Sequence, residues 1–203
     1  MNQNDLRVIK TKRALSQSLF QLLEEKMFSN ITVNMICQTA LVHRTTFYKH
    51  FYDKYDLLTY LMNDITQDYF ETDIRERIRQ PFQSLNIFMS HPVDKIDIKQ
   101  RHDKEFFETV TSLFIQKLRQ DIIDNEDKIE IPNEVPIELV ARVFDSVITA
   151  IGEWNYQSDF DENCSLFSME YPEKLDKIFN QLVNIKLKPV SYTHLTLPTT
   201  PYV

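Results

Sequence analysis

The chain has 203 residues, a formal net charge of −7 and one glycine, Gly152. A single glycine excludes both a glycine-rich phosphate loop and a dinucleotide-binding fingerprint. The eight prolines and the scarcity of alternating apolar runs predict an all-α protein with long helices. No uninterrupted apolar run approaches the ~18 residues of a membrane span and no N-terminal signal pattern is present, so we expect a cytoplasmic protein without a membrane partner.

The charge is divided unevenly along the chain. Residues 1–60 contain eight Lys/Arg and five Asp/Glu, a net charge of +3, whereas residues 61–203 contain fifteen and twenty-five, a net charge of −10. A basic N-terminal part on an acidic remainder favours nucleic acid as the partner of the N-terminal part alone.

A first helix is expected from about Asp5 to Lys26. One face is formed by Leu15, Leu19, Leu22 and Leu23, and Arg7, Lys10, Lys12 and Arg13 make its start basic. These basic side chains can reach a neighbouring phosphate or a minor groove, and a solvated helix end explains each of them equally well.

Residues 31–54, ITVNMICQTALVHRTTFYKHFYDK, predict two short helices joined by a tight turn. In the first, apolar residues recur at helical spacing over residues 33–40, and Thr32 precedes them as an N-cap. The second is expected over about Arg44–Phe51, with Phe47 and Phe51 four residues apart on its inner face.

Placing Phe47 inward directs other side chains of the second helix to solvent. Thr45 and Lys49 then point away from the core, flanked by Thr46, Tyr48 and Tyr52, while Arg44 opens the helix near its inner edge, and no acid occurs until Asp53. This inventory suits phosphate contacts and hydrogen bonds to base edges in a major groove. The alternative is an ordinary helix pair with a solvated polar face.

Asp53 is expected to cap the next helix, with Asp56 at its third position. Lys54 lies in the first turn, so its charge and the N-terminal amide groups of the helix would face one DNA phosphate. This helix is expected to continue to about Arg79 and to connect the N-terminal part with the remainder.

The remaining elements follow from periodicity and proline. Within residues 81–103 only FQSLNIFMS indicates a short helix, because the rest shows no sustained period. Longer helices are expected from Lys104, from Pro136 to about Tyr156, and from Pro172 to Ile185, with an acidic loop before Pro136. The tail from Pro189, PVSYTHLTLPTTPYV, has no helical period and resembles translated linker sequence.

Many of these residues resemble the N-terminal domain of the TetR family of transcriptional regulators. The resemblance covers about residues 8–60 and rests on Phe28, Ile31-Thr32-Val33, Ala40, Arg44 to Phe51, Lys54 and Leu57-Leu58. Leu41 stands where the family usually has glycine, a residue suited to positive φ, and His43 stands where a serine usually caps the second helix. Residues 150–154 are weakly similar to the dihydroxyacetone-kinase operon regulators.

The resemblance implies a three-helix helix-turn-helix domain at residues 1–52, a helical dimerisation and ligand domain at 53–188, and a non-native or disordered tail at 189–203. The protein is then expected to bind a pseudo-palindromic double-stranded DNA operator as a homodimeric repressor, released by a small-molecule effector. The expected DNA-binding residues are Thr32, Arg44, Thr45, Thr46, Tyr48, Lys49, His50 and Lys54.

The effector is expected in a pocket between the long helices. The candidate lining residues are Phe106, Phe107, Phe144 and Trp154, although core packing explains them better. The apolar stripes of residues 137–151 and 175–183, which include Phe144 and Leu182, are expected at the dimer joint. In the family the last two long helices pair with their counterparts as a four-helix bundle.

No nucleophile context, cysteine pairing or metal-ligand cluster is recognisable, so we expect neither catalysis nor a cofactor nor a bound metal. A function of another class remains open, in which a degenerate helix-turn-helix no longer reads DNA and the acidic remainder docks a protein partner. Leu41 and His43 are the residues that favour this alternative.

Overall fold

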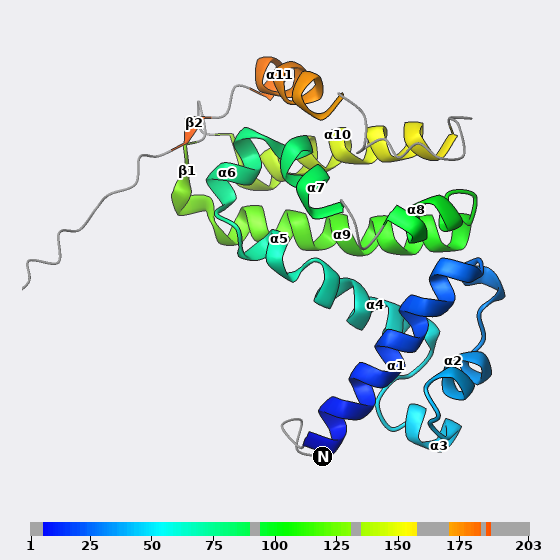
Figure 1. The fold of residues 1–203 in the computed structure, drawn as a ribbon. Coiled ribbons are helices and arrows are strands. Elements are labelled where there is room, and N and C mark those ends of the chain that lie inside the picture. The colour runs from blue at the N-terminus through cyan, green and yellow to red at the C-terminus, as the bar shows by residue number, and fades with distance from the viewer. Residues whose placement is uncertain (1–5, 90–93, 131–134, 158–170, 184–185, 188–203) are drawn as a thin grey trace, which may run out of the picture.

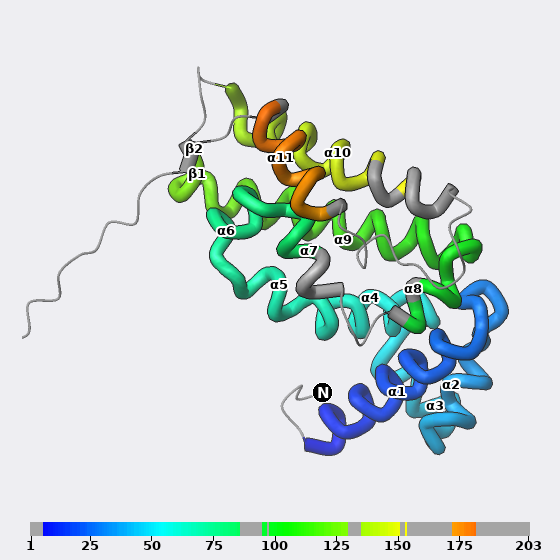
Figure 2. The backbone as a smooth tube through the Cα atoms, turned by 45° about the horizontal axis from the view of Figure 1, so that its top comes forward, coloured from blue at the N-terminus to red at the C-terminus, as the bar shows by residue number. Residues whose placement is uncertain are grey.

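The protein is all-α, apart from one two-residue ladder, and has two stacked parts (Figure 1). The computed structural model describes residues 6–89, 94–130, 135–157, 171–183 and 186–187. We call residues 6–65 the head and residues 67–187 the body. In Figures 1 and 2, the long helix α9 (Lys104–Asp124) lies between α4 (Lys54–Ile65) of the head and α10 (Ile137–Gln157) of the body.

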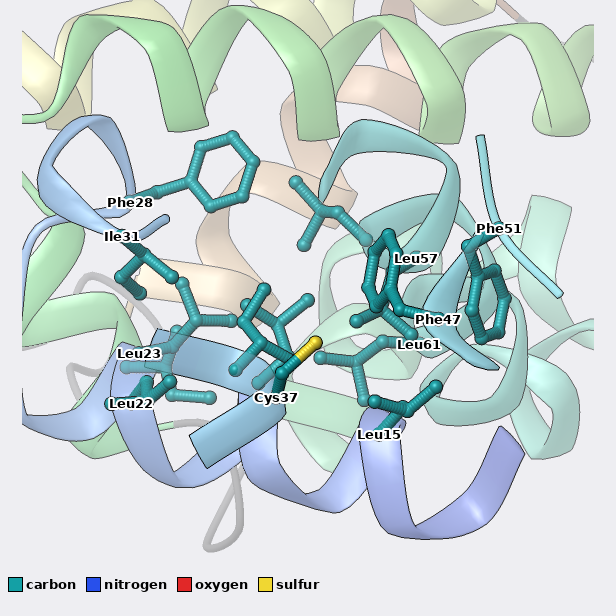
Figure 3. Packing of buried hydrophobic residues seen from close by; sticks show 14 residues of the cluster. Leu15, Leu22, Leu23, Phe28, Ile31, Cys37, Phe47, Phe51, Leu57 and Leu61 are labelled. Carbon is teal, nitrogen blue, oxygen red and sulfur yellow. The ribbon is translucent and has the colours of Figure 1, made fainter. Parts of the chain in front are cut away.

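The head packs around one apolar cluster. Its elements are α1 (Leu6–Glu25), the 3₁₀ turn η1 (Phe28–Asn30), α2 (Val33–Thr39), α3 (Arg44–Phe47) and α4. Figure 3 shows side chains from all of these elements converging in the cluster, among them Leu15, Phe28, Cys37, Phe47 and Leu61. The helical spacing of the leucines in α1 thus produces the expected buried face.

The second helix of the pair is shorter than expected. α3 ends at Phe47, and the chain continues to Phe51 as tighter turns in which Lys49 N–H donates to Thr46 O and His50 N–H donates to Phe47 O. Phe51 N–H still donates to Phe47 O at 2.9 Å, so both phenylalanines point into the head core. The inward face was therefore predicted correctly, although the helix length was not.

The single helix expected from Asp53 to Arg79 is wrong. The chain forms α4, α5 (Gln67–Glu71) and α6 (Ile74–Arg79) instead. Thr66, at φ −86° and ψ 0°, separates the first two helices, and Thr72 is extended before the third. Asp73 then caps α6 by accepting a hydrogen bond from Arg75 N–H at 2.8 Å.

Residues 81–103 contain two helices, of which only the first was expected. α7 (Pro81–Met89) begins at a proline, and α8 (Asp94–Gln100) follows after four residues outside the described part. The sequence did not predict α8, because two buried residues, Ile96 and Gln100, are too few to reveal a helical period. Ile96 lies in the head cluster, so α8 completes the core of the head from the body side.

The body has its own core between α6, α7, α9, α10 and α11 (Tyr171–Val183). This second cluster includes Ile78, Phe82, Leu118, Phe144 and Phe179. A 3₁₀ turn, η2 (Glu126–Lys128), leads into β1 (Ile129–Glu130), which pairs antiparallel with β2 (Lys186–Leu187). Residues 158–170 and the expected tail, residues 189–203, lie outside the described residues. Within the described ranges, no helix is both long and apolar enough to cross a membrane.

The last helix is fastened to the body by a cap between distant segments. Asp176 of α11 accepts hydrogen bonds from the backbone N–H groups of Phe82 at 2.8 Å and Gln83 at 3.2 Å. It thereby satisfies free amide groups at the start of α7, where Pro81 contributes none. Asn180 adds a bond to Arg79 O at 2.9 Å, so one face of α11 lies against its own body.

Candidate nucleic-acid interface

The turn between α2 and α3 has the geometry of a helix C-terminal cap. Leu41 has φ 54° and is 94% exposed. Val42 N–H donates to Cys37 O at 2.9 Å and Leu41 N–H donates to Gln38 O at 3.3 Å, which is the Schellman pattern. The left-handed position that glycine usually occupies is therefore kept with leucine, so the helix pair retains its tight turn.

The two helices begin differently. Thr32 caps α2 as expected, with its hydroxyl oxygen accepting from Met35 N–H at 3.3 Å. His43 gives α3 no side-chain cap; its carbonyl oxygen accepts from Thr46 N–H at 2.8 Å and Phe47 N–H at 3.0 Å. The start of α3 is therefore held by backbone hydrogen bonds alone, and the His43 side chain is exposed beside it.

A buried aromatic residue directs the outer face of α3. Phe47 is fully buried and lies edge-on to Tyr48, with ring centroids 5.3 Å apart. Arg44, Thr45 and Lys49 are exposed, Tyr48 is 51% exposed, and Thr46 is half-buried. The structure therefore brings together, on one side of the head, five of the eight residues expected to contact DNA.

Arg44 and Tyr48 are ordered against each other on this face. Arg44 Nη2 donates to Tyr48 Oη at 3.4 Å, and the guanidinium lies 5.9 Å from the centre of the tyrosine ring. The hydrogen bond that Arg44 donates to Tyr48 raises the pKa of Arg44, so its charge is permanent. Residues 26–52 contain no Asp or Glu, so no carboxylate of this segment opposes an approaching phosphate.

His50 is placed behind this face. It is half-buried, and burial followed by the charges of Lys12 and Lys49 lowers its pKa, so the ring is neutral at pH 7. Its Nδ1 is buried and has no hydrogen-bond partner within the part of the chain that the structure describes. The ammonium of Lys12 lies 5.6 Å from the Phe51 ring and 5.4 Å from the Tyr60 ring, which holds a positive charge next to His50.

Lys54 contacts the 3₁₀ turn η1 and the helix α9. Its ammonium donates to Phe28 O at 2.9 Å, pairs with Glu105 of α9 at 2.7 Å and lies 4.3 Å from the Phe28 ring centre. The amide groups at the start of α4 are also occupied, because Asp53 accepts from Tyr55 and Asp56 N–H at 2.9 Å. The geometry thus differs from the phosphate contact expected of Lys54, and the lysine joins the head to the body instead.

Two buried residues between α8 and α9 also join the head to the body, and the periodicity of the sequence did not predict them. Gln100 accepts from Phe28 N–H at 2.8 Å and donates to the carbonyl oxygens of Leu23 and Lys26. Asp103 accepts from the Ser29 amide and hydroxyl at 2.8 and 2.9 Å and also caps α9. The only local signal for Asp103 is its place directly before the helix start expected at Lys104, which is typical of an N-cap.

Two of the four residues expected to line an effector pocket, Phe106 and Phe144, lie in different cores. Phe106 packs against the head core, with its ring 6.1 Å from Phe28. Phe144 is 1% exposed in the body core and lies 4.8 Å from the Phe179 ring. Phe107 is half-buried on α9, and the side chain of Trp154 lies outside the described residues. Phe106 and Phe144 are separated because two cores share α9, each core using a different stretch of it.

A groove of about 400 Å³ does lie in the structure, where α4 crosses α9. Its floor is apolar and is formed by Met62, Val110, Leu113 and Phe114. Its polar lining includes Asn63, Thr66 and Lys117. This site was not expected from the sequence, because its polar residues are distributed over two helices that are far apart in the chain.

The fold of this chain is similar to the folds of several solved structures. A TetR transcriptional regulator from Streptococcus agalactiae has a TM-score of 0.59 and 22% identity, over 88% of this chain and 96% of that chain. NalD, the secondary repressor of the MexAB-OprM multidrug efflux pump in Pseudomonas aeruginosa, has a TM-score of 0.51 and 16% identity, over 86% and 96% of the two chains. The dihydroxyacetone kinase operon activator DhaS has a TM-score of 0.50 and 16% identity, over 87% and 97%. No protein-family model matches the sequence, and no curated protein matches it. The protein has the TetR-type fold, which confirms the fold that the resemblance of residues 8–60 implied.

Proposed function

We propose that this protein is a transcriptional regulator that binds double-stranded DNA through α3 and the turn that follows it. The observation that carries the proposal is the exposed face of Arg44, Thr45, Tyr48 and Lys49, held outward by buried Phe47 and free of acids in residues 26–52. A helix-turn-helix uses such a face in the major groove, where side chains near the start of the second helix reach base edges. The turn at Leu41 supports this reading over a degenerate helix pair, because its left-handed geometry is intact.

The residues divide into two roles. Arg44, Thr45 and Thr46 lie at the start of α3, where they reach base edges and set the preferred sequence. Tyr48 and Lys49 lie one turn on and contact the phosphate backbone, together with Thr32 at the start of α2. His50, half-buried and neutral, acts by packing behind Lys49 rather than by contributing charge.

The protein acts as a homodimer on a pseudo-palindromic operator. One head offers one short α3 and few phosphate contacts, so two heads about one helical turn of DNA apart double the contacts. Phe144, which was expected at the joint, is buried in the body core and is not available for it, and Leu182 lies outside the described side chains. Among the side chains of α10 and α11 that the structure describes, the large apolar ones exposed to solvent are Leu139, at 52%, Val143, at 45%, and Ile178, at 54%. We assign the joint to these residues. Leu139 and Val143 lie on the side of α10 opposite its buried residues Ala141 and Phe144, and Ile178 lies on α11.

We further propose that the protein represses its target. A dimer on an operator blocks a promoter with no contact beyond those to DNA, whereas activation requires an additional surface for the transcription machinery. The names of similar structures include a repressor and an activator, so the direction must be tested in a reporter strain with and without the protein.

DNA binding is tested by titrating salt between about 50 and 200 mM while measuring affinity for a random duplex. Phosphate contacts make the logarithm of affinity fall steeply with the logarithm of salt concentration. Lys49→Met should reduce the slope by about one unit, whereas Lys104→Met, on an exposed lysine of α9, should leave it unchanged. A flat wild-type slope would reject DNA binding and favour the protein-docking alternative.

A further inference from the structure

Arg44 and Tyr48 form a pair on the exposed side of α3. Tyr48 N–H donates to Arg44 O at 3.1 Å, which places the two residues one turn apart on the same side. Arg44 Nη2 donates to Tyr48 Oη at 3.4 Å, and the guanidinium carbon lies 5.9 Å from the centre of the ring. Among the residues that the structure describes, no carboxylate oxygen lies within 4.0 Å of Arg44. The tyrosine therefore orients this arginine, and no acid competes with it.

The tyrosine ring is itself held by the head core. Phe47 is fully buried, and its ring meets the Tyr48 ring edge-on, with centroids 5.3 Å apart and planes at 83°. The order of the core thus extends through Phe47 and Tyr48 to the guanidinium of Arg44. An arginine that is ordered before binding loses less rotamer freedom when it binds, so a contact made by Arg44 is tighter and more selective.

The bond to Tyr48 leaves one pair of donors on the guanidinium free. A guanidinium is planar and has five N–H donors in a fixed arrangement. Its Nη2 group takes part in both of the edges that present two parallel N–H bonds, one edge with Nε and the other with Nη1. Tyr48 occupies one N–H of Nη2 and therefore one edge. The other edge can donate two parallel hydrogen bonds to a single partner.

Two parallel donors select one base in the major groove. Guanine presents two adjacent acceptors there, O6 and N7. Adenine and cytosine each present an amino group, which is a donor and does not bond a guanidinium, and thymine presents one acceptor beside a methyl group. Guanine is therefore the base that matches the free edge of Arg44.

The Tyr48 hydroxyl also has a bond left to make. A phenol oxygen can accept and donate at once, and this one accepts from Arg44. Within the described ranges, its own O–H has no acceptor. Accepting from a cation makes an O–H a stronger donor, and the charged oxygens of the phosphates are the strongest acceptors on DNA.

We infer that this protein reads a guanine in each half of its operator through a bidentate contact from Arg44. Tyr48 is the positioning residue, which holds the arginine while its own O–H donates to a backbone phosphate. One hydroxyl thereby couples the phosphate contact to the base contact. The inference rests on the proposed DNA-binding function and adds the base that is read and the residue that positions its reader.

The base is tested with analogues in an operator that the full-length protein selects from a random duplex library. Each guanine of a half-site is replaced in turn by 7-deazaguanine, which lacks the N7 acceptor, or by inosine, which lacks only the minor-groove amino group. At one position 7-deazaguanine should weaken binding about fivefold or more, whereas inosine should leave the affinity almost unchanged. A selected operator without guanine, or equal effects of the two analogues at every guanine, would overturn the inference.

Three variants assign the discrimination between guanine and 7-deazaguanine to its residues. Arg44→Ala should abolish it. Tyr48→Phe keeps the ring against Phe47 and removes only the hydroxyl, so it should fold normally and reduce the discrimination to about twofold. Tyr52→Phe is the matched control, because it removes the hydroxyl of another exposed tyrosine of the same segment, and it should keep the full discrimination. Full discrimination in Arg44→Ala would overturn the guanine contact, and full discrimination in Tyr48→Phe would overturn the positioning role.

The double variant and the salt slope exclude the remaining explanations. Adding Tyr48→Phe to Arg44→Ala should not change the discrimination further, and a further change would show that Tyr48 reads the base without the arginine. If Arg44→Ala instead flattens the salt slope by about one unit and keeps the discrimination, Arg44 contacts a phosphate and the inference is wrong. A wild-type protein without salt-dependent affinity for duplex DNA would reject the proposed function, and this inference with it. Salt-dependent binding without dependence on guanine N7 would reject the inference alone.

Discussion

Replacing Leu41 by glycine should stabilise the protein. A left-handed conformation costs a residue with a Cβ atom about 1–2 kcal/mol, and Leu41 occupies it at φ 54°. Glycine removes that strain but gives the unfolded chain more freedom, which offsets about 0.5–1 kcal/mol. Because Leu41 is 94% exposed, almost no apolar burial is lost with its side chain. The free energy of unfolding should therefore rise by roughly 0.5–1 kcal/mol.

The assay is urea unfolding followed by circular dichroism, with two control variants at the same position. Leu41→Ala keeps the Cβ atom and therefore the strain, so it should unfold close to the wild type. Leu41→Asn should fall between alanine and glycine, because asparagine tolerates the left-handed region better than most residues. A glycine variant that is less stable than the alanine variant would refute the conformational argument. Operator affinity should be unchanged in all three, because the turn geometry is already that of the glycine form.

Four further changes address the head, the junction and the joint. Arg44→Ala should relax base preference and reduce affinity for the selected operator by roughly 1–3 kcal/mol, and recovery of the wild-type motif in a binding-site selection would contradict this. Lys54→Met should lower the free energy of unfolding by about 1 kcal/mol and leave the salt slope of DNA binding unchanged. A flatter slope in this variant would instead indicate that Lys54 contacts a phosphate. Burial raises the pKa of Asp103, but the hydrogen bonds to its carboxylate outweigh burial and lower it. The free energy of unfolding of the wild type should therefore fall as pH drops below about 4, and it should fall less in Asp103→Asn. The same pH dependence of stability in both proteins would contradict this role of Asp103. Leu139→Asp should sediment as a folded monomer and bind the operator much more weakly than the wild type. A dimer with wild-type operator affinity would show that the dimer joint lies on another surface.

The head was predictable because its signals are local. The leucine face of α1, the cap at Thr32 and the pair Phe47/Phe51 each lie within one or two turns of the chain, and each appears in the structure as expected. The direction of the face beyond Phe47 followed from the same spacing, without knowledge of the rest of the fold.

The errors occurred where partners are distant in the chain. The ion pair of Lys54 with Glu105 was missed because Glu105 lies on a helix fifty-one residues later, while the contact of Lys54 with DNA stays a prediction. α8 was missed because Ile96 is buried against the head, a surface that no local pattern of residues 94–100 reveals. The break at Thr66 was missed because a short apolar stripe on each side of it continues the same period.

The packing of α8 on the head also bears on how the protein is made. During synthesis an N-terminal domain generally folds as a unit once it has left the ribosome. Here the residues that complete the core of the head and hold η1, among them Ile96, Gln100 and Asp103, are translated 45 to 52 residues after Phe51. A nascent chain that ends at residue 65 therefore has every residue of the helix-turn-helix and still exposes part of its apolar cluster. The head therefore becomes fully folded only after the body helices α5 to α8 and the start of α9 have been made.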